Sequence, residues 1–106
     1  MNNEYIIDLA GVAARKELHE RIEAALPVPE WYGRNLDALH DLLTEPCFGD
    51  HCLILFINCT EFAQSMPRYF AAMQQMCKAA VDANPGLIVE FADGNDRGFI
   101  DNLLTI

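Results

Sequence analysis

Residues 53–57 read Leu-Ile-Leu-Phe-Ile, an apolar run without polar residues at alternate positions. A strand with one face in solvent alternates apolar and polar side chains, whereas a strand covered on both faces does not. Crossover helices packed on a parallel sheet provide such cover. The run therefore predicts a buried strand in an α/β domain.

Two more apolar runs, at residues 5–7 and 87–91, lie between turn and cap residues and predict two further strands. Apolar residues at spacings of three and four predict helices between the strands. The predicted helices cover residues 14–26, 36–44, 60–64 and 67–83. Because parallel crossovers are right-handed, the order β-α-α-β-α-α-β favours a three-stranded parallel sheet packed with helices.

Charge limits the partners that this chain can bind. At 106 residues it has the length of one domain, and 52% hydrophobic residues are enough for a folded core. Sixteen acidic residues against 7 basic ones give a formal net charge of −9. Such a chain is repelled by nucleic acid and attracted to cationic proteins. We therefore expect a basic protein as partner and no direct contact with nucleic acid.

The chain shows neither an apolar stretch of membrane-spanning length nor a signal peptide at its start, which predicts no membrane contact and a cytoplasmic location. In a reducing compartment cysteines are expected as buried thiols rather than disulfides. The four cysteines are Cys47, Cys52, Cys59 and Cys77.

Residues 26–44, LPVPEWYGRNLDALHDLLT, contain a helix with two different faces. At 3.6 residues per turn the leucines share one face, which predicts core packing. The opposite face carries Asp37, His40, Asp41 and Thr44. Asn35, just before the helix, is a favourable N-cap residue. The polar face predicts an exposed acidic stripe.

The turn before this helix carries Trp31 and Tyr32, where exposed aromatic side chains would have no role in folding. Such residues are typical anchors of protein interfaces. Gly33 would allow a tight turn or the close approach of a partner. Most charged stripes are only solvated, but the neighbouring aromatic residues favour a binding surface here.

The pattern LPxxxWYGxNLDALxDxLT, at Leu26-Pro27 and Trp31 through Thr44, resembles the signature of the barstar family of ribonuclease inhibitors. The likeness covers residues 4–92. It implies a barstar-like domain at residues 1–93, followed by an extension at 94–106. Helix-like spacing of apolar residues predicts that this extension packs on the same domain.

The resemblance implies that the second helix and the preceding turn plug the cationic active site of a ribonuclease. Carboxylates can replace substrate phosphates there and accept charge-assisted hydrogen bonds. Asp41 matches the family's principal carboxylate and Asp37 the second. The other predicted contact residues are Trp31, Tyr32, Gly33, Asn35, His40, Thr44 and Asp82. We expect a free monomer that blocks a ribonuclease as an immunity protein against a bacterial toxin, without a cofactor.

Some positions depart from the family pattern and leave the target open. His40 stands where the family pattern has a tryptophan, and Pro46 stands where it has another aromatic residue. The family also has an acidic contact residue late in its long helix. One alignment matches this residue with Asp82, and another places Lys78 there. An immunity protein for a different toxin, or a regulator of a basic protein that is not a nuclease, is the alternative. Protonation of His40 at mildly acidic pH is expected to weaken binding to a cationic partner.

A metal or hydrolytic site is a further alternative. Its candidate ligands form two groups, Asp37, His40 and Asp41, and Cys47, His51 and Cys52. Neither group has the paired spacing of a structural zinc site, and no base, nucleophile and oxyanion arrangement is visible. We therefore expect no metal and no enzymatic activity. Surface positions are expected for all three histidines, His19, His40 and His51.

Overall fold

The computed structural model describes residues 3–45, 48 and 51–92. Its elements are β1 (Asn3–Asp8), α1 (Arg15–Ala25), α2 (Leu36–Leu43), β2 (Cys52–Ile57), α3 (Thr60–Ser65), α4 (Pro67–Ala83) and β3 (Leu87–Phe91). The predicted order β-α-α-β-α-α-β is confirmed. The extension at 94–106 and its packing lie outside the described residues.

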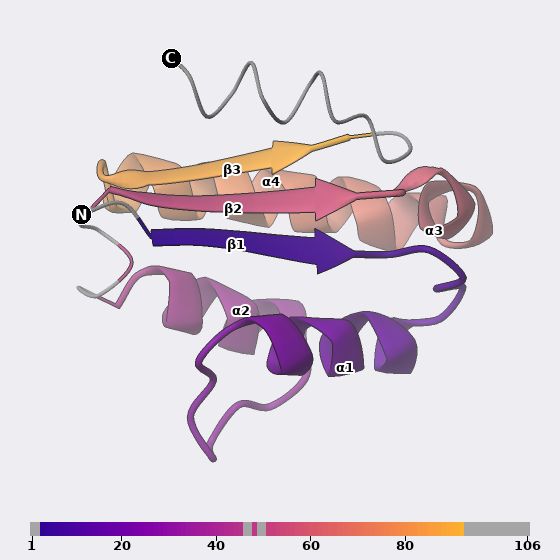
Figure 1. The fold of residues 1–106 in the computed structure, drawn as a ribbon, viewed down its shortest axis with the longest axis horizontal. Coiled ribbons are helices and arrows are strands. Elements are labelled where there is room, and N and C mark those ends of the chain that lie inside the picture. Colours follow the sequence, from indigo (N-terminus) through magenta and orange to yellow (C-terminus); the bar gives the residue numbers. More distant parts are fainter. Residues whose placement is uncertain (1–2, 46–47, 49–50, 93–106) are drawn as a thin grey trace.

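The three strands form one parallel sheet in the order β1-β2-β3 (Figure 1). Ile54 of β2 lies opposite Tyr5 of β1 and Val89 of β3, so β2 is the central strand. Every residue of β2 except Leu53 is buried. The structure confirms the buried strand that the apolar run predicted.

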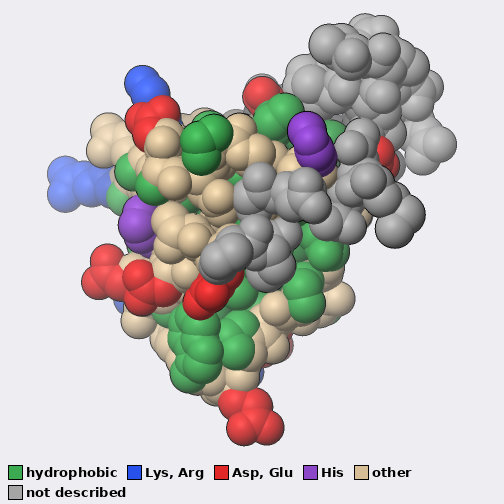
Figure 2. Space-filling model, turned by 90° about the vertical axis from the view of Figure 1, so that its left-hand side faces the viewer, with side chains coloured by type: hydrophobic (Ala, Val, Ile, Leu, Met, Phe, Trp, Pro, Cys, Tyr) green, Lys and Arg blue, Asp and Glu red, His purple; other side chains and the backbone are tan. Residues whose placement is uncertain are grey.

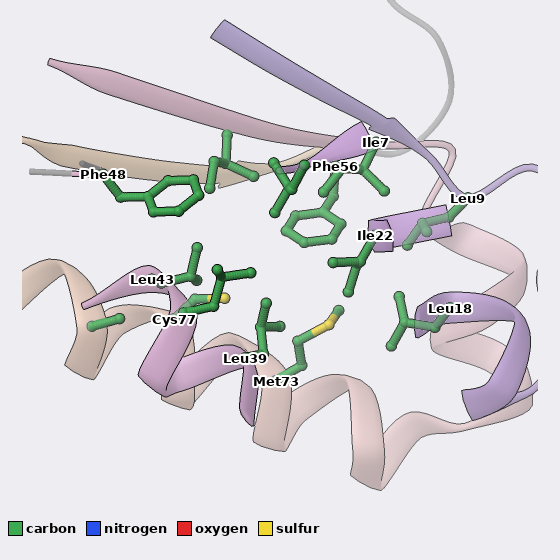
Figure 3. Close-up of a cluster of buried hydrophobic side chains, with 14 of the residues drawn as sticks. Ile7, Leu9, Leu18, Ile22, Leu39, Leu43, Phe48, Phe56, Met73 and Cys77 are labelled. Carbon is green, nitrogen blue, oxygen red and sulfur yellow. The ribbon is translucent and has the colours of Figure 1, made fainter. Parts of the chain in front are cut away.

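The main core lies between the sheet and the helices α1, α2 and α4 (Figure 3). Side chains from β1, β2 and these helices meet there without solvent contact, among them Ile7, Phe56, Ile22, Leu39 and Met73. Their spacing of three and four along each helix is the spacing from which the helices were predicted. This packing fixes the inner face of α2 and leaves its other face outward.

The second face of β2 is buried as well. Leu55 and Ile57 point away from the main core, because side chains alternate along a strand, and they cluster with Ala92. Within the described ranges, however, α1, α2 and α4 pack on the main-core side only. The structure therefore differs from the expected helical cover on both faces.

The ends of the helices follow local rules. Ala14 and Leu26 have extended backbones and flank α1, so the helix is one residue shorter at each end than predicted. Pro67 occupies the first turn of α4, where its missing N–H costs no hydrogen bond. Asn84 ends α4 and leads into β3.

Two further expectations concern cysteines and membranes. Cys77 is a buried free thiol, and burial raises its pKa to about 12. It packs in the core as a small apolar side chain, as the sequence predicted. Among the described residues, no helix is long and apolar enough to cross a membrane.

Candidate functional site

Asn35 fixes the start of α2. Its backbone is extended, and its side-chain oxygen accepts a hydrogen bond of 2.7 Å from the backbone N–H of Ala38. Its amide nitrogen donates to the carbonyl oxygen of Gly33 at 3.3 Å. The predicted N-cap is confirmed. Asn35 thereby links the turn to the helix and fixes the residue at which α2 begins.

The turn before α2 uses a different residue from the one expected. Arg34, not Gly33, has the left-handed backbone, with a φ of 53°. A side chain at Gly33 would instead meet the Asn35 amide nitrogen at 3.3 Å. A side chain at Gly33 would thus crowd the cap, while the left-handed residue of the turn is Arg34 rather than Gly33. The close approach of a partner at Gly33 stays a prediction.

The two faces of α2 divide as the sequence predicted. Leu39, Leu42 and Leu43 are buried, whereas Asp37 and Asp41 are exposed. The Asp41 side chain is 72% exposed. Among the described residues, no hydrogen bond reaches either carboxylate, and Nδ1 of His40 lies 4.0 Å from Oδ1 of Asp41. Neither carboxylate therefore accepts a hydrogen bond within the described part of the chain, although Asp37 lies in the first turn of α2, where the helix dipole favours a negative charge.

The end of α2 is closed by hydrogen bonds. The Thr44 hydroxyl donates to the carbonyl oxygens of His40 and Asp41 at 3.0 and 3.1 Å. From the end of α4, the Asn84 amide donates to the carbonyl oxygen of Leu43 at 2.9 Å. The bonds to Asp41 and Leu43 serve carbonyl groups at the helix end that lack a partner within the helix, whereas the His40 carbonyl also accepts from the backbone N–H of Thr44 at 3.0 Å. The acidic face is therefore displayed on a helix that is held at both ends.

Trp31 is exposed, as predicted, with 54% of its surface accessible. It borders an open groove of about 420 Å³ that sequence reasoning missed. The groove is lined by Pro27, Val28, Pro29, Trp31, Leu42, Glu45 and Phe48. Figure 2, which views the molecule from the left-hand side of Figure 1, shows acidic side chains beside exposed hydrophobic ones. An apolar surface next to carboxylates suits a protein partner.

Tyr32 is not exposed, so that expectation is wrong. Its side chain is only 8% accessible, and its hydroxyl lies 2.7 Å from Nδ1 of His19. The expected surface position of His19 is also wrong, because this residue is fully buried. Its Nε2 lies 2.8 Å from the hydroxyl of Tyr69. The three side chains form a polar link from α1 through the turn to α4.

The electrostatics of this link follow from burial. Burial lowers the pKa of His19, so the ring is held neutral. A neutral imidazole has one donor and one acceptor nitrogen, so one tyrosine hydroxyl donates to the ring and the other accepts from it. Burial raises the pKa of Tyr32 and of Tyr69. His19 was detectable in the sequence, because it stands three and seven residues before the apolar Ile22 and Leu26.

Asp82 lies on the exposed side of α4, two residues before Asn84, which contacts the end of α2. Lys78 is exposed one turn earlier on the same helix. The structure thus brings the end of α4 to the end of α2, and both alternatives for the late-helix contact remain exposed. His51 is exposed as expected, and among the described residues no three potential ligands form a metal-binding group.

The sequence model of one protein family, described as Barstar (barnase inhibitor), matches residues 2–93. This range holds all the helices and strands described above. A comparison with curated proteins found no match.

Proposed function

The chain belongs to the barstar family, and we propose on this basis that it is an intracellular inhibitor of a ribonuclease. The target would be a cationic enzyme, such as a bacterial toxin, and the inhibitor would act as an immunity protein in the cytoplasm. The free protein would be a monomer, without enzymatic activity, cofactor or direct contact with nucleic acid.

The observation that carries this proposal is the pair of exposed carboxylates on α2, which accept no hydrogen bond from the residues that the structure describes. Asp37 and Asp41 are exposed and lie one helical turn apart, a rise of about 6 Å. A helix held at both ends presents them in a fixed orientation, so little freedom is lost on binding. In a ribonuclease cleft they would accept hydrogen bonds from the cations that hold RNA phosphates.

The surroundings support occlusion rather than chemistry. Trp31 stands exposed before α2 and would pack against the rim of the cleft, where aromatic residues contribute most to affinity. The net charge of −9 would accelerate the encounter with a cationic enzyme. The remaining predicted contacts, Gly33, Asn35, His40, Thr44 and Asp82, would surround these anchors. Tyr32 is buried and would contribute indirectly, by stabilising the turn that carries Trp31.

One residue favours a second candidate function. His40 stands on the acidic face where the family pattern has a tryptophan, so the surface offered to a partner is smaller and more polar. An immunity protein for another toxin, or a regulator of a basic protein that does not cleave RNA, would use the same carboxylates. It would bind its partner without changing any RNA cleavage.

The test is inhibition of RNA cleavage. Purified barnase is the first probe, followed by basic proteins captured from the source organism on the wild-type chain. We expect the wild type to stop cleavage and the Asp37→Ala/Asp41→Ala variant to lose this effect. Glu4→Ala/Glu20→Ala removes the same charge from exposed positions on β1 and α1 and should still inhibit.

The possible results separate the two functions. Inhibition of a captured ribonuclease, but not of barnase, would support the proposal with a different target. Carboxylate-dependent capture of a protein that does not cleave RNA would overturn it in favour of the second function. Equal capture by the wild type and the double variant would mean that the acidic face is only solvated.

A further inference from the structure

A basic pocket lies at the start of α2, separate from the groove beside Trp31. It is open and has a volume of about 450 Å³. It is lined by Arg15, Lys16, Arg34, Asn35, Leu36, Asp37 and Tyr69. Three of the 7 lysines and arginines of this acidic chain therefore gather around one pocket.

The three cations are held in different ways. The Arg15 guanidinium lies over the Tyr69 ring, 5.5 Å from its centroid. Arg34 forms a two-pronged ion pair with Glu23, with its Nη2 3.2 Å from Oε2. Lys16 is exposed, and within the described part of the chain no hydrogen bond or ion pair involves its ammonium group. The pocket wall thus carries three cations and the Asp37 carboxylate, and the Lys16 ammonium group has no direct contact among the described residues.

Tyr69 and Glu23 give Arg15 and Arg34 partners within the fold, whereas no contact among the described residues accounts for Lys16. Arg15 and Lys16 occupy the first turn of α1, where the helix dipole favours acidic residues and disfavours cations. Arg34 has a left-handed backbone, which is unfavourable for a residue other than glycine. Residues that break local folding rules together at one place are commonly there for binding.

The position of the pocket suggests what it binds. Asp37 belongs both to the acidic face and to the pocket wall, so a partner seated on Asp37 and Asp41 also reaches Lys16 and Arg15. A purely cationic surface would be repelled there, since like charges brought together at an interface cost several kcal/mol. The opposing part of the partner must therefore be negative.

We propose that the basic pocket receives an aspartate or glutamate side chain of the target ribonuclease, next to the cationic cleft that binds Asp37 and Asp41. This inference rests on the proposed function. Asp37 and Asp41 would contact cations of the enzyme, and the basic pocket would contact its carboxylate. Together these two contacts of opposite sign fix the orientation of the enzyme. They also exclude basic proteins that lack a carboxylate at this place, so the pocket contributes to specificity.

Lys16→Glu tests the proposal, with Arg68→Glu as the matched control. Both residues are exposed, both are second in their helix, and both substitutions change the net charge by −2. Arg68 does not line the pocket. Overall charge alone predicts that both variants bind a cationic enzyme slightly better. The pocket predicts the opposite for Lys16→Glu, a loss in affinity of about tenfold or more.

Affinities are measured with the ribonuclease that the wild type inhibits, together with Asp41→Ala. Weakened binding by Lys16→Glu but not by Arg68→Glu supports the pocket, as does its rescue by an acidic-to-lysine change on the enzyme. Equal or stronger binding by Lys16→Glu, while Asp41→Ala loses inhibition, overturns the pocket and leaves the proposed function intact. If no ribonuclease is inhibited, or if Asp41→Ala changes nothing, both proposals fail.

Discussion

Asp37 and Tyr32 lie five residues apart in the sequence, yet Asp37 is in solvent and Tyr32 is inside the protein. The polar side-chain atoms of Tyr32 and His19 are all hydrogen-bonded: the hydroxyl of Tyr32 pairs with His19, and His19 pairs with Tyr69. Around Asp37 and Asp41 the fold, as far as it is described, uses no polar atom. The inner side of the segment 31–44 holds the structure, and its outer side is left for a partner.

This difference has an energetic meaning. A buried polar group must be paired, because an unpaired one costs about 1–3 kcal/mol. An exposed carboxylate that is hydrogen-bonded only to water contributes little to folding. Stability should therefore depend on the inner residues and affinity on the outer ones. Substitutions on each side test whether stability and affinity are separated in this way.

The largest effect is expected from Asp41→Ala on the outer side. Affinity for the inhibited ribonuclease should fall by about 4 kcal/mol or more, roughly a thousandfold, because cations of the enzyme lose a buried partner. The free energy of unfolding should change by less than about 0.5 kcal/mol. Titration calorimetry and urea denaturation measure the two quantities. A loss of stability comparable to the loss of affinity would mean that Asp41 belongs to the fold.

The second effect concerns the apolar inner side. Leu39→Ala should lower the free energy of unfolding by about 3 kcal/mol, since Leu39 is fully buried between α2 and the sheet. Leu36→Ala, at a half-buried position of the same helix, should cost clearly less. The folded fraction of both variants should still inhibit. A specific loss of inhibition by folded Leu39→Ala would break the separation of the two sides.

The features predictable from the sequence are those with a local pattern. The unbroken apolar run at 53–57 predicted the central buried strand, and the leucine spacing predicted the two faces of α2. Asn35 was recognisable as a cap because its effect reaches only three residues along the chain. Each of these signals lies within one element, where periodicity and capping act directly.

The missed features join distant segments. Tyr69 is fifty residues from His19 in the chain, and only the packing of α4 brings the two together. Tyr32 was therefore placed in solvent, since aromatic residues in a polar turn are usually exposed when they have no visible partner. The basic pocket likewise combines residues 15–16 with Arg34, and its wall includes Tyr69. Such sites follow from topology rather than from local sequence.

The third effect concerns the polar link. Tyr32→Phe should lower the free energy of unfolding by about 2 kcal/mol, because Nδ1 of the buried His19 loses its partner. Tyr5→Phe is the control: Tyr5 is half-buried beside Phe48, and its hydroxyl has no hydrogen bond among the described residues. Near-equal stabilities in urea denaturation would show that the link contributes nothing. Weaker inhibition by folded Tyr32→Phe would show that it also positions Trp31.

The smallest effect is the response of the inner side to acid. Burial lowers the pKa of His19 in the folded protein, whereas in the unfolded chain it titrates near 6.5. Between these two pKa values the unfolded chain binds more protons, so stability falls as the pH falls. The contribution of His19 is complete above pH 6.5 and decreases below it by at most about 1.4 kcal/mol per pH unit.

Urea denaturation between pH 5 and 8 measures this slope. His19→Gln, which cannot titrate, should be less stable at pH 8 and should lose the part of the slope that begins near pH 6.5. His40→Gln, on the outer side, should keep it, because the His40 ring is partly exposed and lies beside the exposed Asp41 rather than in the core. If the pH dependence of the free energy of unfolding disappears in His40→Gln instead, the acid-sensitive contact lies on the outer face. Stability would then depend on the outer side, contrary to the separation argued above.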